Sequence, residues 1–157
     1  MRGGPTADER ALELAYKALS GRDRTVAELR AYLGHKRIDS DAIEHAVEEL
    51  AGAGFLDDAR FAERFAEDKR TIERWGSERV ERELRRRGVA PEHVSAAVAA
   101  QEPGDELQAA LALLVERVPP PRSDRERDRA WRLLARKGYS PELAYEAVRA
   151  HAREEAA

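Results

Sequence analysis

Hydrophobic residues recur at spacings of three and four along almost the whole chain, which is the period of helices buried on one face. No sustained alternation of apolar and polar residues and no Asn-Gly turn indicates a β-hairpin. The pattern therefore predicts an all-α fold. The expected helices are 8–20, 26–35, 40–53, 58–73, 78–87, 91–101, 104–118, 124–137 and 141–154.

Local signals support these helix ends. Thr25 and Ser123 stand three residues before Glu28 and Glu126, the spacing of a capping box. Proline fits the first position of a helix, where its missing N–H costs nothing, and glycine fits the position after the last. The residues concerned are Pro91 and Pro141 at helix starts and Gly54, Gly88 and Gly138 at helix ends.

A helix-turn-helix unit occurs three times, with periods of 51 and then 50 residues. Each copy has a leucine, a bulky apolar residue at +5, a helix-starting residue at +7, a further apolar residue at +10 and a valine at +14. The three sets are Leu33, Ile38, Ser40, Ile43 and Val47; Leu84, Val89, Pro91, Val94 and Val98; and Leu134, Tyr139, Pro141, Ala144 and Val148. With the helix that precedes each copy, the pattern predicts three tandem three-helix repeats in an elongated, curved array. Chance similarity among alanine-rich amphipathic helices is the alternative.

The expected domain boundaries follow from this register. A disordered N-terminus covers residues 1–7, and the three repeats cover residues 8–56, 57–102 and 103–155. The third repeat contains a stiff proline-rich connector at 119–122, and Pro103-Gly104 breaks the chain before it.

Charge is distributed with the same period. The 157-residue chain carries 28 basic and 31 acidic side chains, so its net charge of −3 predicts no partner by itself. Residues 22–37, 69–90 and 117–140, which contain the middle helix of each repeat, have net charges of +3, +4 and +5, and the intervening segments are acidic. Repeats stacked in parallel would align the basic helices as a broken positive stripe.

Signatures of catalysis and of membrane insertion are missing from the sequence. The chain has no cysteine, no His pair at i, i+4, and no HExxH, GxSxG or phosphate-loop motif, so we expect no enzyme, no metal and no cofactor. Asp57 and Asp58 could suggest a metal site, but a helix cap explains them better. The N-terminus lacks the apolar core of a signal peptide, and the longest apolar stretch, residues 107–115, is too short to span a bilayer. A cytoplasmic protein without membrane contact is expected.

Two rows of arginines are the candidate binding residues. At 100° per residue, Arg79, Arg82 and Arg86 share an arc of about 60° on the side away from Val80 and Leu84. Self-neutralisation of this helix is an open alternative, because it has favourable i, i+4 pairs: Glu78/Arg82, Glu81/Arg85 and Glu83/Arg87.

The second row lies in the third repeat, opposite Trp131 and Leu134. Its four arginines also fit an arc of about 60°, and only one has an acidic partner in favourable order, the pair Asp128/Arg132. The row consists of Arg125, Arg129, Arg132 and Arg136. Mostly unpaired guanidiniums on one ridge suit phosphates or a carboxylate-rich protein groove, so we expect the binding surface here.

Aromatic residues near these helices could stack on bases or belong to the core. Phe61, Phe65 and Trp131 are expected in the core because they share faces with other apolar residues. Trp75 stands beside Arg74 at a helix start, and both interpretations stay open for it. We include Trp75 in the candidate surface.

Two motifs make the chain similar to a known family. Leu56-Asp57-Asp58-Ala59-Arg60-Phe61-Ala62, followed by residues 75–80, 83–84 and 87–89, resembles the bacterial RecX family, and the similarity runs from about residue 12 to residue 148. The matching residues, with structural roles, are Asp57, Asp58, Arg60, Phe61, Gly76, Leu84 and Gly88.

The resemblance implies a function as well as a fold. Members of the family are built of tandem three-helix repeats and bind the RecA filament along its groove. They lower ATP hydrolysis, strand exchange and coprotease activity in homologous recombination, DNA repair and the SOS response. The partners implied are therefore the RecA filament and, through the basic ridge, single- or double-stranded DNA, with the chain acting as a monomer.

Two other functions remain open at this stage. Residues 25–57 resemble the core of a helix-turn-helix transcription regulator, although the threefold repeat argues against it. A scaffold that binds only proteins is the other alternative.

Overall fold

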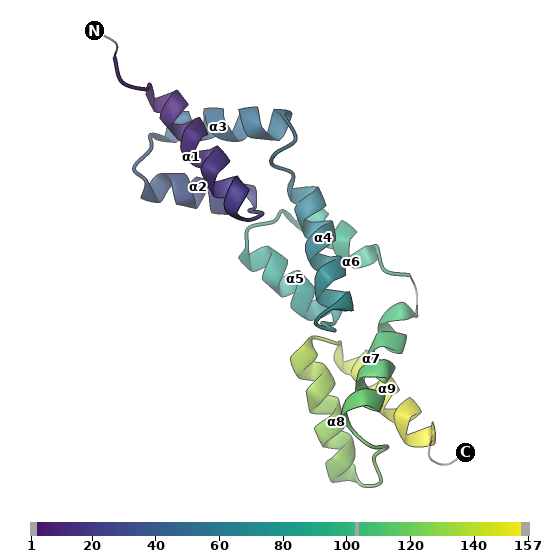
Figure 1. The fold of residues 1–157 in the computed structure, drawn as a ribbon. Helices are drawn as coiled ribbons and strands as arrows, with labels where there is room; N and C mark the ends of the chain where they lie inside the picture. Colours follow the sequence, from purple (N-terminus) through teal and green to yellow (C-terminus); the bar gives the residue numbers. More distant parts are fainter. Residues whose placement is uncertain (1–2, 103, 155–157) are drawn as a thin grey trace. The chain divides into compact units, whose positions relative to one another are not determined.

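The computed structural model describes residues 3–102 and 104–154, and this part of the chain forms nine helices and no strand. Figure 1 shows how the helices follow one another along the chain. The helices are α1 (Ala7–Gly21), α2 (Val26–His35), α3 (Ser40–Gly52), α4 (Asp58–Thr71), α5 (Ser77–Arg86), α6 (Pro91–Ala99), α7 (Asp105–Arg117), α8 (Asp124–Lys137) and α9 (Pro141–Glu154). The expected all-α class is confirmed. The predicted helix bounds differ from the observed ones by two residues at most. Within the described ranges, no helix is long and apolar enough to cross a membrane.

The first predicted capping box is present and the second is half formed. The Thr25 hydroxyl accepts the N–H of Glu28 at 3.1 Å, and the Glu28 carboxylate accepts the N–H of Thr25 at 3.0 Å. Ser123 accepts the N–H of Glu126, but the Glu126 carboxylate accepts the N–H of Arg122. The backbone of Ser123 has φ −140° against −77° at Thr25, and this rotation takes its N–H away from the helix start.

A third capping box starts α1 and was not expected from the sequence. Thr6 and Glu9 exchange the same two hydrogen bonds, at 3.1 and 3.3 Å. Thr6 therefore caps α1 and Ala7 is its first residue, although both fall within the N-terminal segment predicted to be disordered. Of the other expectations for the chain ends and breaks, those for residues 1–2, 103 and 155 lie outside the described part of the chain.

The repeated leucine and its +5 partner form one backbone motif three times. After each middle helix, the N–H at +5 bonds to the carbonyl of the leucine, and the residue at +4 has a positive φ, as in a Schellman helix end. The N–H to carbonyl pairs are Ile38 to Leu33 at 3.2 Å, Val89 to Leu84 at 3.1 Å and Tyr139 to Leu134 at 3.1 Å. The three leucines are fully buried, so the sequence period reports a helix end packed against a core.

The contacts group the described residues into two compact units. One runs up to Ala62 and includes Leu84–Val94, and the other consists of Glu63–Glu83 and the residues from Ser95 onward. Consequently α4, α5 and α6 each contribute residues to both units. The three repeats expected from the sequence period remain a prediction at the level of their boundaries.

Each unit has its own core of small and branched side chains. In the first unit α1 and α2 pack on α3, and alanines on α1 lie against leucines of the other two helices. The main members are Ala11, Ala15, Leu29, Leu33 and Leu50, all fully buried. In the second unit α7 and α8 pack on α9 around Leu113, Leu114, Leu134, Ala144 and Ala147. Trp131 lies half-buried against this core, as expected, and its indole N–H donates to the carbonyl of Pro141 at 3.3 Å.

Candidate interaction surface

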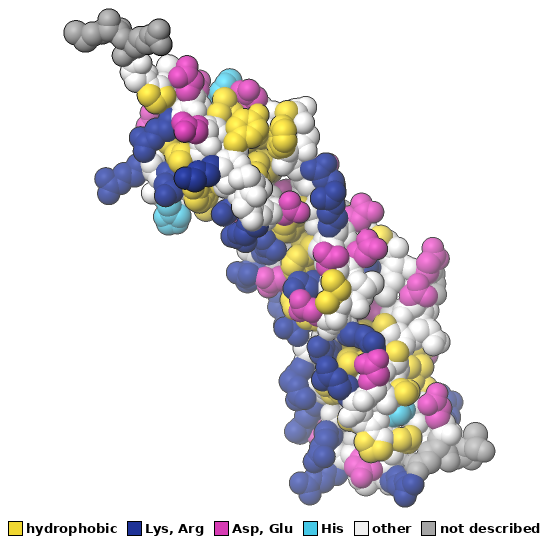
Figure 2. All heavy atoms as spheres, in the orientation of Figure 1, with side chains coloured by type: hydrophobic (Ala, Val, Ile, Leu, Met, Phe, Trp, Pro, Cys, Tyr) yellow, Lys and Arg dark blue, Asp and Glu magenta, His cyan; other side chains and the backbone are white. Residues whose placement is uncertain are grey.

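The α8 arginines form an exposed row in the second unit. Arg125, Arg129, Arg132 and Arg136 are all solvent exposed, and together with Asp128 they line a shallow hollow on the surface. Figure 2 shows dark blue side chains gathered along this helix, at the lower left of the view. Arg132 forms the predicted ion pair with Asp128 at 2.9 Å. Within residues 3–102 and 104–154, the other three arginines of the row have no ion-pair partner.

The α5 arginines do not form one uniform row. Arg82 and Arg86 are exposed, whereas Arg79 is half-buried. The Arg79 guanidinium lies 4.1 Å from the centroid of the Trp75 ring and donates to the carbonyl of Arg136 at 3.3 Å. The first row therefore reaches the second at Arg79 and Arg136.

One of the predicted i, i+4 pairs of α5 is absent from the described residues. In the described part of the chain Glu78 and Arg82 form no ion pair, so Arg82 is available to a partner. Arg87 forms a bidentate pair with Glu28, which precedes it by 59 residues. Self-neutralisation is thus absent at Arg82, the middle member of this row.

Trp75 is half-buried among side chains of its own unit. The Lys69 ammonium lies 4.7 Å from the ring centroid, and the Phe65 ring meets the Trp75 ring edge-on at 6.1 Å. A base stacking on the face that Arg79 covers would have to displace that guanidinium, which costs the cation–π contact. The Trp75 indole therefore packs against side chains of its own unit, a role that the sequence alone left open beside base stacking.

Two backbone junctions position these surfaces, and the first lies around the start of α2. The Val26 N–H donates to Asp58 at 3.0 Å, and the Thr25 hydroxyl donates to the carbonyl of Arg87 at 2.7 Å. Gly88 has φ +84°, and a Cβ on it would lie 2.4 Å from the Cβ of Ala27. Asp58 thus accepts an N–H at the start of α2 that an isolated helix would leave without a partner. The Thr25 hydroxyl likewise gives a partner to the Arg87 carbonyl just after the end of α5.

The second junction repeats this arrangement around the start of α5. The Ser77 N–H donates to Glu106 at 2.8 Å, and the Gly76 N–H donates to the carbonyl of Lys137 at 2.8 Å. Gly138 has φ +96°, and a Cβ on it would lie 2.2 Å from the Cβ of Arg79. Gly76 is equally restricted, since its Cβ would lie 2.5 Å from the backbone of Gly138. The start of α5 is therefore held against the end of α8, which is how Arg79 comes to Arg136.

Removing the Thr25 hydroxyl tests the first junction. Thr25→Val is expected to lower the free energy of unfolding by about 2 kcal/mol, because the change removes a helix cap and leaves the partly buried Arg87 carbonyl without its donor. Urea unfolding followed by circular dichroism measures this change. Thr6→Val, which removes an exposed cap, is the matched control and should cost about 1 kcal/mol or less.

The pKa of Glu28 gives this junction a pH dependence. Burial alone would raise the pKa of Glu28, but the Thr25 N–H and the Arg87 guanidinium outweigh burial and lower it below the ordinary value of 4.5. A carboxyl with a lowered pKa in the folded state stabilises the fold above its unfolded pKa, and that stabilisation is lost as the pH falls through the folded pKa.

We therefore expect the free energy of unfolding to decline as the pH falls below about 5, and to decline less in Glu28→Gln. Urea titrations at several pH values measure the difference. Glu44→Gln is the control, because the pKa of Glu44 is lowered by its hydrogen bond with Arg30 but this pair is exposed to solvent. Equal pH slopes in the wild type and Glu28→Gln would contradict the assignment.

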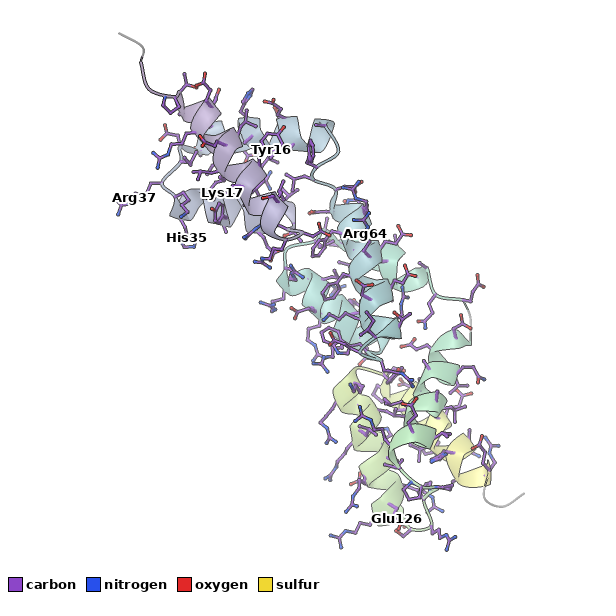
Figure 3. The ribbon with its side chains drawn as sticks, viewed as in Figure 1. Tyr16, Lys17, His35, Arg37, Arg64 and Glu126 are labelled. Atoms are coloured by element: carbon purple, nitrogen blue, oxygen red, sulfur yellow. The ribbon has the colours of Figure 1, made fainter. Side chains whose placement is uncertain are left out.

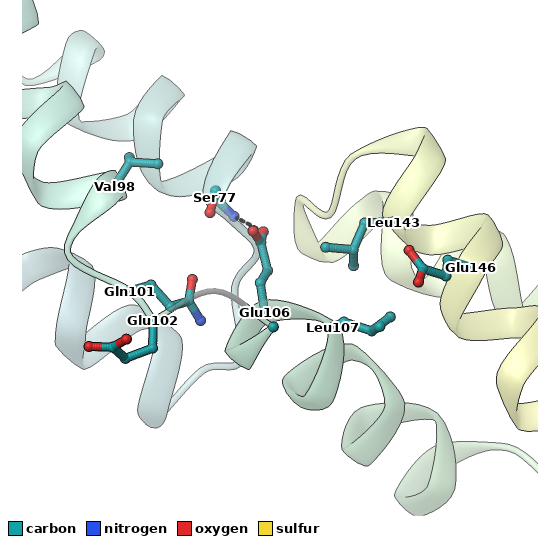
Figure 4. Close-up of a pocket in the computed structure, with 9 residues that line it drawn as sticks. Ser77, Val98, Gln101, Glu102, Glu106, Leu107, Leu143 and Glu146 are labelled. Carbon is teal, nitrogen blue, oxygen red and sulfur yellow. Dashed lines mark hydrogen bonds between the residues drawn. The ribbon is translucent and has the colours of Figure 1, made fainter.

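A second hollow, in the unit that contains α8, has the opposite charge. It lies where α5, α6, α7 and α9 approach one another and combines Glu102, Glu106 and Glu146 with Leu107 and Leu143 (Figure 4). The Glu106 carboxylate is already bonded to the Ser77 N–H, which Figure 4 marks with a dashed line. Across the described residues, no group of three or more His, Asp or Glu side chains could hold a metal ion.

Comparison with known proteins identifies the family. Models of the first and second three-helix domains of RecX match residues 11–50 and 57–98. Regulatory protein RecX of Trichlorobacter lovleyi is 38% identical over 135 residues, which are 82% of this chain and 87% of that protein. The chain belongs to the RecX family. RecX of Thermobifida fusca is 34% identical over 94% of this chain and 83% of its own length.

The fold agrees with that of a solved RecX structure. The crystal structure of RecX from Lactobacillus salivarius matches with a TM-score of 0.83 at 17% identity and covers 92% of this chain and 96% of that one. The matches to the RecX domain models and relatives confirm the resemblance predicted from the two motifs, and this fold confirms the all-α helical-repeat class.

The structure assigns a role to each residue of the RecX motifs. Asp57 caps α4 by accepting the Arg60 N–H at 3.0 Å, and Arg60 in turn donates to the carbonyl of Gly54 at 2.8 Å. The Phe61 ring is half-buried, and the Arg87 guanidinium lies over it, 4.6 Å from the ring centroid. Leu84 is fully buried. The remaining three, Asp58, Gly76 and Gly88, are the junction residues described above.

Proposed function

We propose that this RecX chain binds the RecA nucleoprotein filament and negatively modulates its activities, including ATP hydrolysis, strand exchange and the coprotease function. Family membership supports a regulatory role, and the resemblance of the motifs points to RecA as the partner. The observation that carries the proposal is the exposed α8 row, where one of four arginines has an ion pair among the described residues.

The α8 row fits a surface that is rich in carboxylates or phosphates. Guanidiniums on successive turns of one helix lie close enough to act together, and each can form a bidentate pair with either anion. Within this proposal, the row contacts acidic protein surface of the filament groove, DNA phosphates, or both. The acidic segments between the basic helices would weaken binding to duplex DNA alone.

The chain is proposed to act by binding and not by catalysis. The sequence contains no recognised nucleophile motif, and the strongest candidate cluster, Asp57 with Asp58, is used for helix capping and for the first junction. Binding to a filament end or groove requires no turnover by the chain itself.

The test is single-stranded-DNA-dependent ATP hydrolysis by RecA, titrated with this chain from far below one copy per RecA. Inhibition at substoichiometric ratios is expected, because one bound copy affects many filament subunits. No inhibition of an active RecA would refute the proposal. A sequence-dependent shift of duplex DNA without RecA would favour the transcription-regulator alternative instead.

A further inference from the structure

The end of α2 has the backbone of a junction surface but lacks its partner. Residues 36–38 superpose in the repeat register on residues 87–89 and 137–139 and make the same helix-ending bonds. The Arg37 N–H bonds to the Gly34 carbonyl at 3.0 Å, as the Gly88 N–H bonds to that of Arg85 at 3.0 Å and the Gly138 N–H to that of Ala135 at 3.1 Å. All three residues have positive φ: +60°, +84° and +96°.

At the other two positions this surface receives the start of a helix. The carbonyls of Arg87 and Lys137 accept hydrogen bonds from Thr25 and Gly76, the residues that precede α2 and α5. An acidic residue in the first turn of α4 or α7, Asp58 or Glu106, accepts an N–H from the same helix start. The equivalent carbonyl at Lys36 has no such donor among the described residues.

Arg37 also occupies a position where the backbone favours glycine. A side chain at φ +60° is strained, and glycine removes this strain at Gly54, Gly88 and Gly138. Arg74, the other non-glycine residue with a positive φ, forms an ion pair with Glu116 at 2.7 Å. Arg37 is exposed and has no ion pair within the described ranges, so contacts inside the molecule do not account for it.

The charge around Arg37 is mainly positive. His35 and Lys36 are exposed beside it, and Figure 3 shows Arg37 extending from the end of α2. The Lys36 ammonium lies 5.6 Å from the centroid of Tyr32, and the Arg24 guanidinium lies 5.0 Å from it. The following acids, Asp39 and Asp41, form no ion pair with these cations in the described part of the chain.

We propose that the end of α2, comprising His35, Lys36 and Arg37, is a docking surface for the acidic N-terminus of a helix in a partner protein. The N–H groups of such a helix would donate to the open carbonyl at Lys36, as the residues before α2 and α5 do at the equivalent carbonyls. Its first-turn carboxylates, which are common because they complement the helix dipole, would pair with Arg37. This surface belongs to the first unit and is separate from the α8 row.

A second copy of this chain is a poorer occupant. The helix start that would dock is that of α8, but the Glu126 and Arg127 N–H groups, equivalent to those of Gly76 and Ser77, already bond to Ser123. The side chain of Arg37 takes the space that Ala27 and Arg79 fill at the two glycines, so a docking helix from any chain must leave room for it there. The chain therefore has a surface that can receive the N-terminus of a helix, whereas the start of its own α8 already uses the N–H groups that would dock there.

The proposal can be tested on the full chain without RecA. The probe is a synthetic helical peptide beginning Ser-Asp-Glu-Glu, added to isotopically labelled protein while backbone amides are observed by NMR. Saturable shifts at residues 33–38 are expected. Arg37→Glu should weaken peptide binding about tenfold, the factor for losing roughly one charged hydrogen bond. Arg153→Glu, a reversal at an exposed arginine of α9, is the matched control and should bind like the wild type.

Three results would overturn the proposal. The first is the absence of shifts at residues 33–38, or equal weakening in Arg37→Glu and Arg153→Glu. The second is tighter binding of a single-stranded oligonucleotide to the same amides, which would make the surface a phosphate site. The third is a loss of stability in Arg37→Gly, which would give the arginine a structural role. A wild-type chain that bound the peptide but did not inhibit RecA would refute only the function proposed above.

Discussion

Gly138→Ala is expected to lower the free energy of unfolding by about 3 kcal/mol. The alanine Cβ would lie 2.2 Å from the Cβ of Arg79 and 2.7 Å from its backbone nitrogen, so α5 and α8 would have to separate. The positive φ of 96° adds backbone strain to this overlap. Strain of this kind and overpacking each cost about 1–3 kcal/mol. Urea unfolding followed by circular dichroism measures the loss.

Gly54→Ala separates the two causes. Gly54 has a similar φ of +83°, but no atom lies within 4 Å of a Cβ placed there. This control should lose only about 1 kcal/mol, from the backbone alone. If Gly138→Ala were no less stable than Gly54→Ala, the close approach of α5 and α8 would be wrong.

The triple charge reversal of Arg129, Arg132 and Arg136 should weaken inhibition of RecA by at least about tenfold. Each reversal replaces an attraction to carboxylates or phosphates by a repulsion, and a factor of ten requires a loss of only about 1.4 kcal/mol. The three side chains are exposed, so helicity should persist. The concentration of the chain at half-inhibition of ATP hydrolysis is the measurement, with the circular dichroism spectrum recorded beside it.

A single reversal on another part of α8 provides the comparison. Arg127 is exposed and pairs with Asp124 at 2.9 Å, outside the row. Arg127→Glu should inhibit nearly as well as the wild type, whereas Arg129→Glu should not. Full inhibition by the triple variant would exclude the α8 row as the contact surface.

Much of the fold could be predicted because helices leave local signals in a sequence. Apolar spacing, proline at Pro91 and Pro141 and glycine at helix ends located every helix of the described chain to within two residues. The repeated pair of a leucine and an apolar residue at +5 is also a local signal, because the two residues bond to each other at the end of one helix. Trp131 and the Asp57 cap could be placed for the same reason.

The two junctions at the starts of α2 and α5 could not be predicted, because at least one partner in each of their hydrogen bonds is a backbone group, which is the same in nearly every residue. The Val26 N–H and the Arg87 carbonyl are backbone groups, and their partners lie 32 and 62 residues away in the chain. Only the side-chain member of each contact, such as Asp58, differs from one sequence to another. The pairing of Arg87 with Glu28 was missed for a related reason, since Glu83 offered a nearer partner in sequence.

The candidate site was predicted in part. The helical period correctly placed the four α8 arginines on an exposed face, because an exposed ridge needs no information from elsewhere in the fold. The period could not show that Arg79 and Trp75 lie against each other, since that contact depends on the turn between α4 and α5. Whether these residues contact a partner remains the prediction tested above.

The junctions also impose an order on folding during synthesis. When α2 leaves the ribosome, Asp58 and Arg87, which bond to its N-terminal end, have not yet emerged. The start of α5 must likewise wait for Glu106, 29 residues after Ser77. A nascent chain therefore holds the start of α2 by its own capping box alone until the next repeat emerges. Folding should trail translation by about one repeat, and a stalled ribosome would leave the newest helix open to proteases.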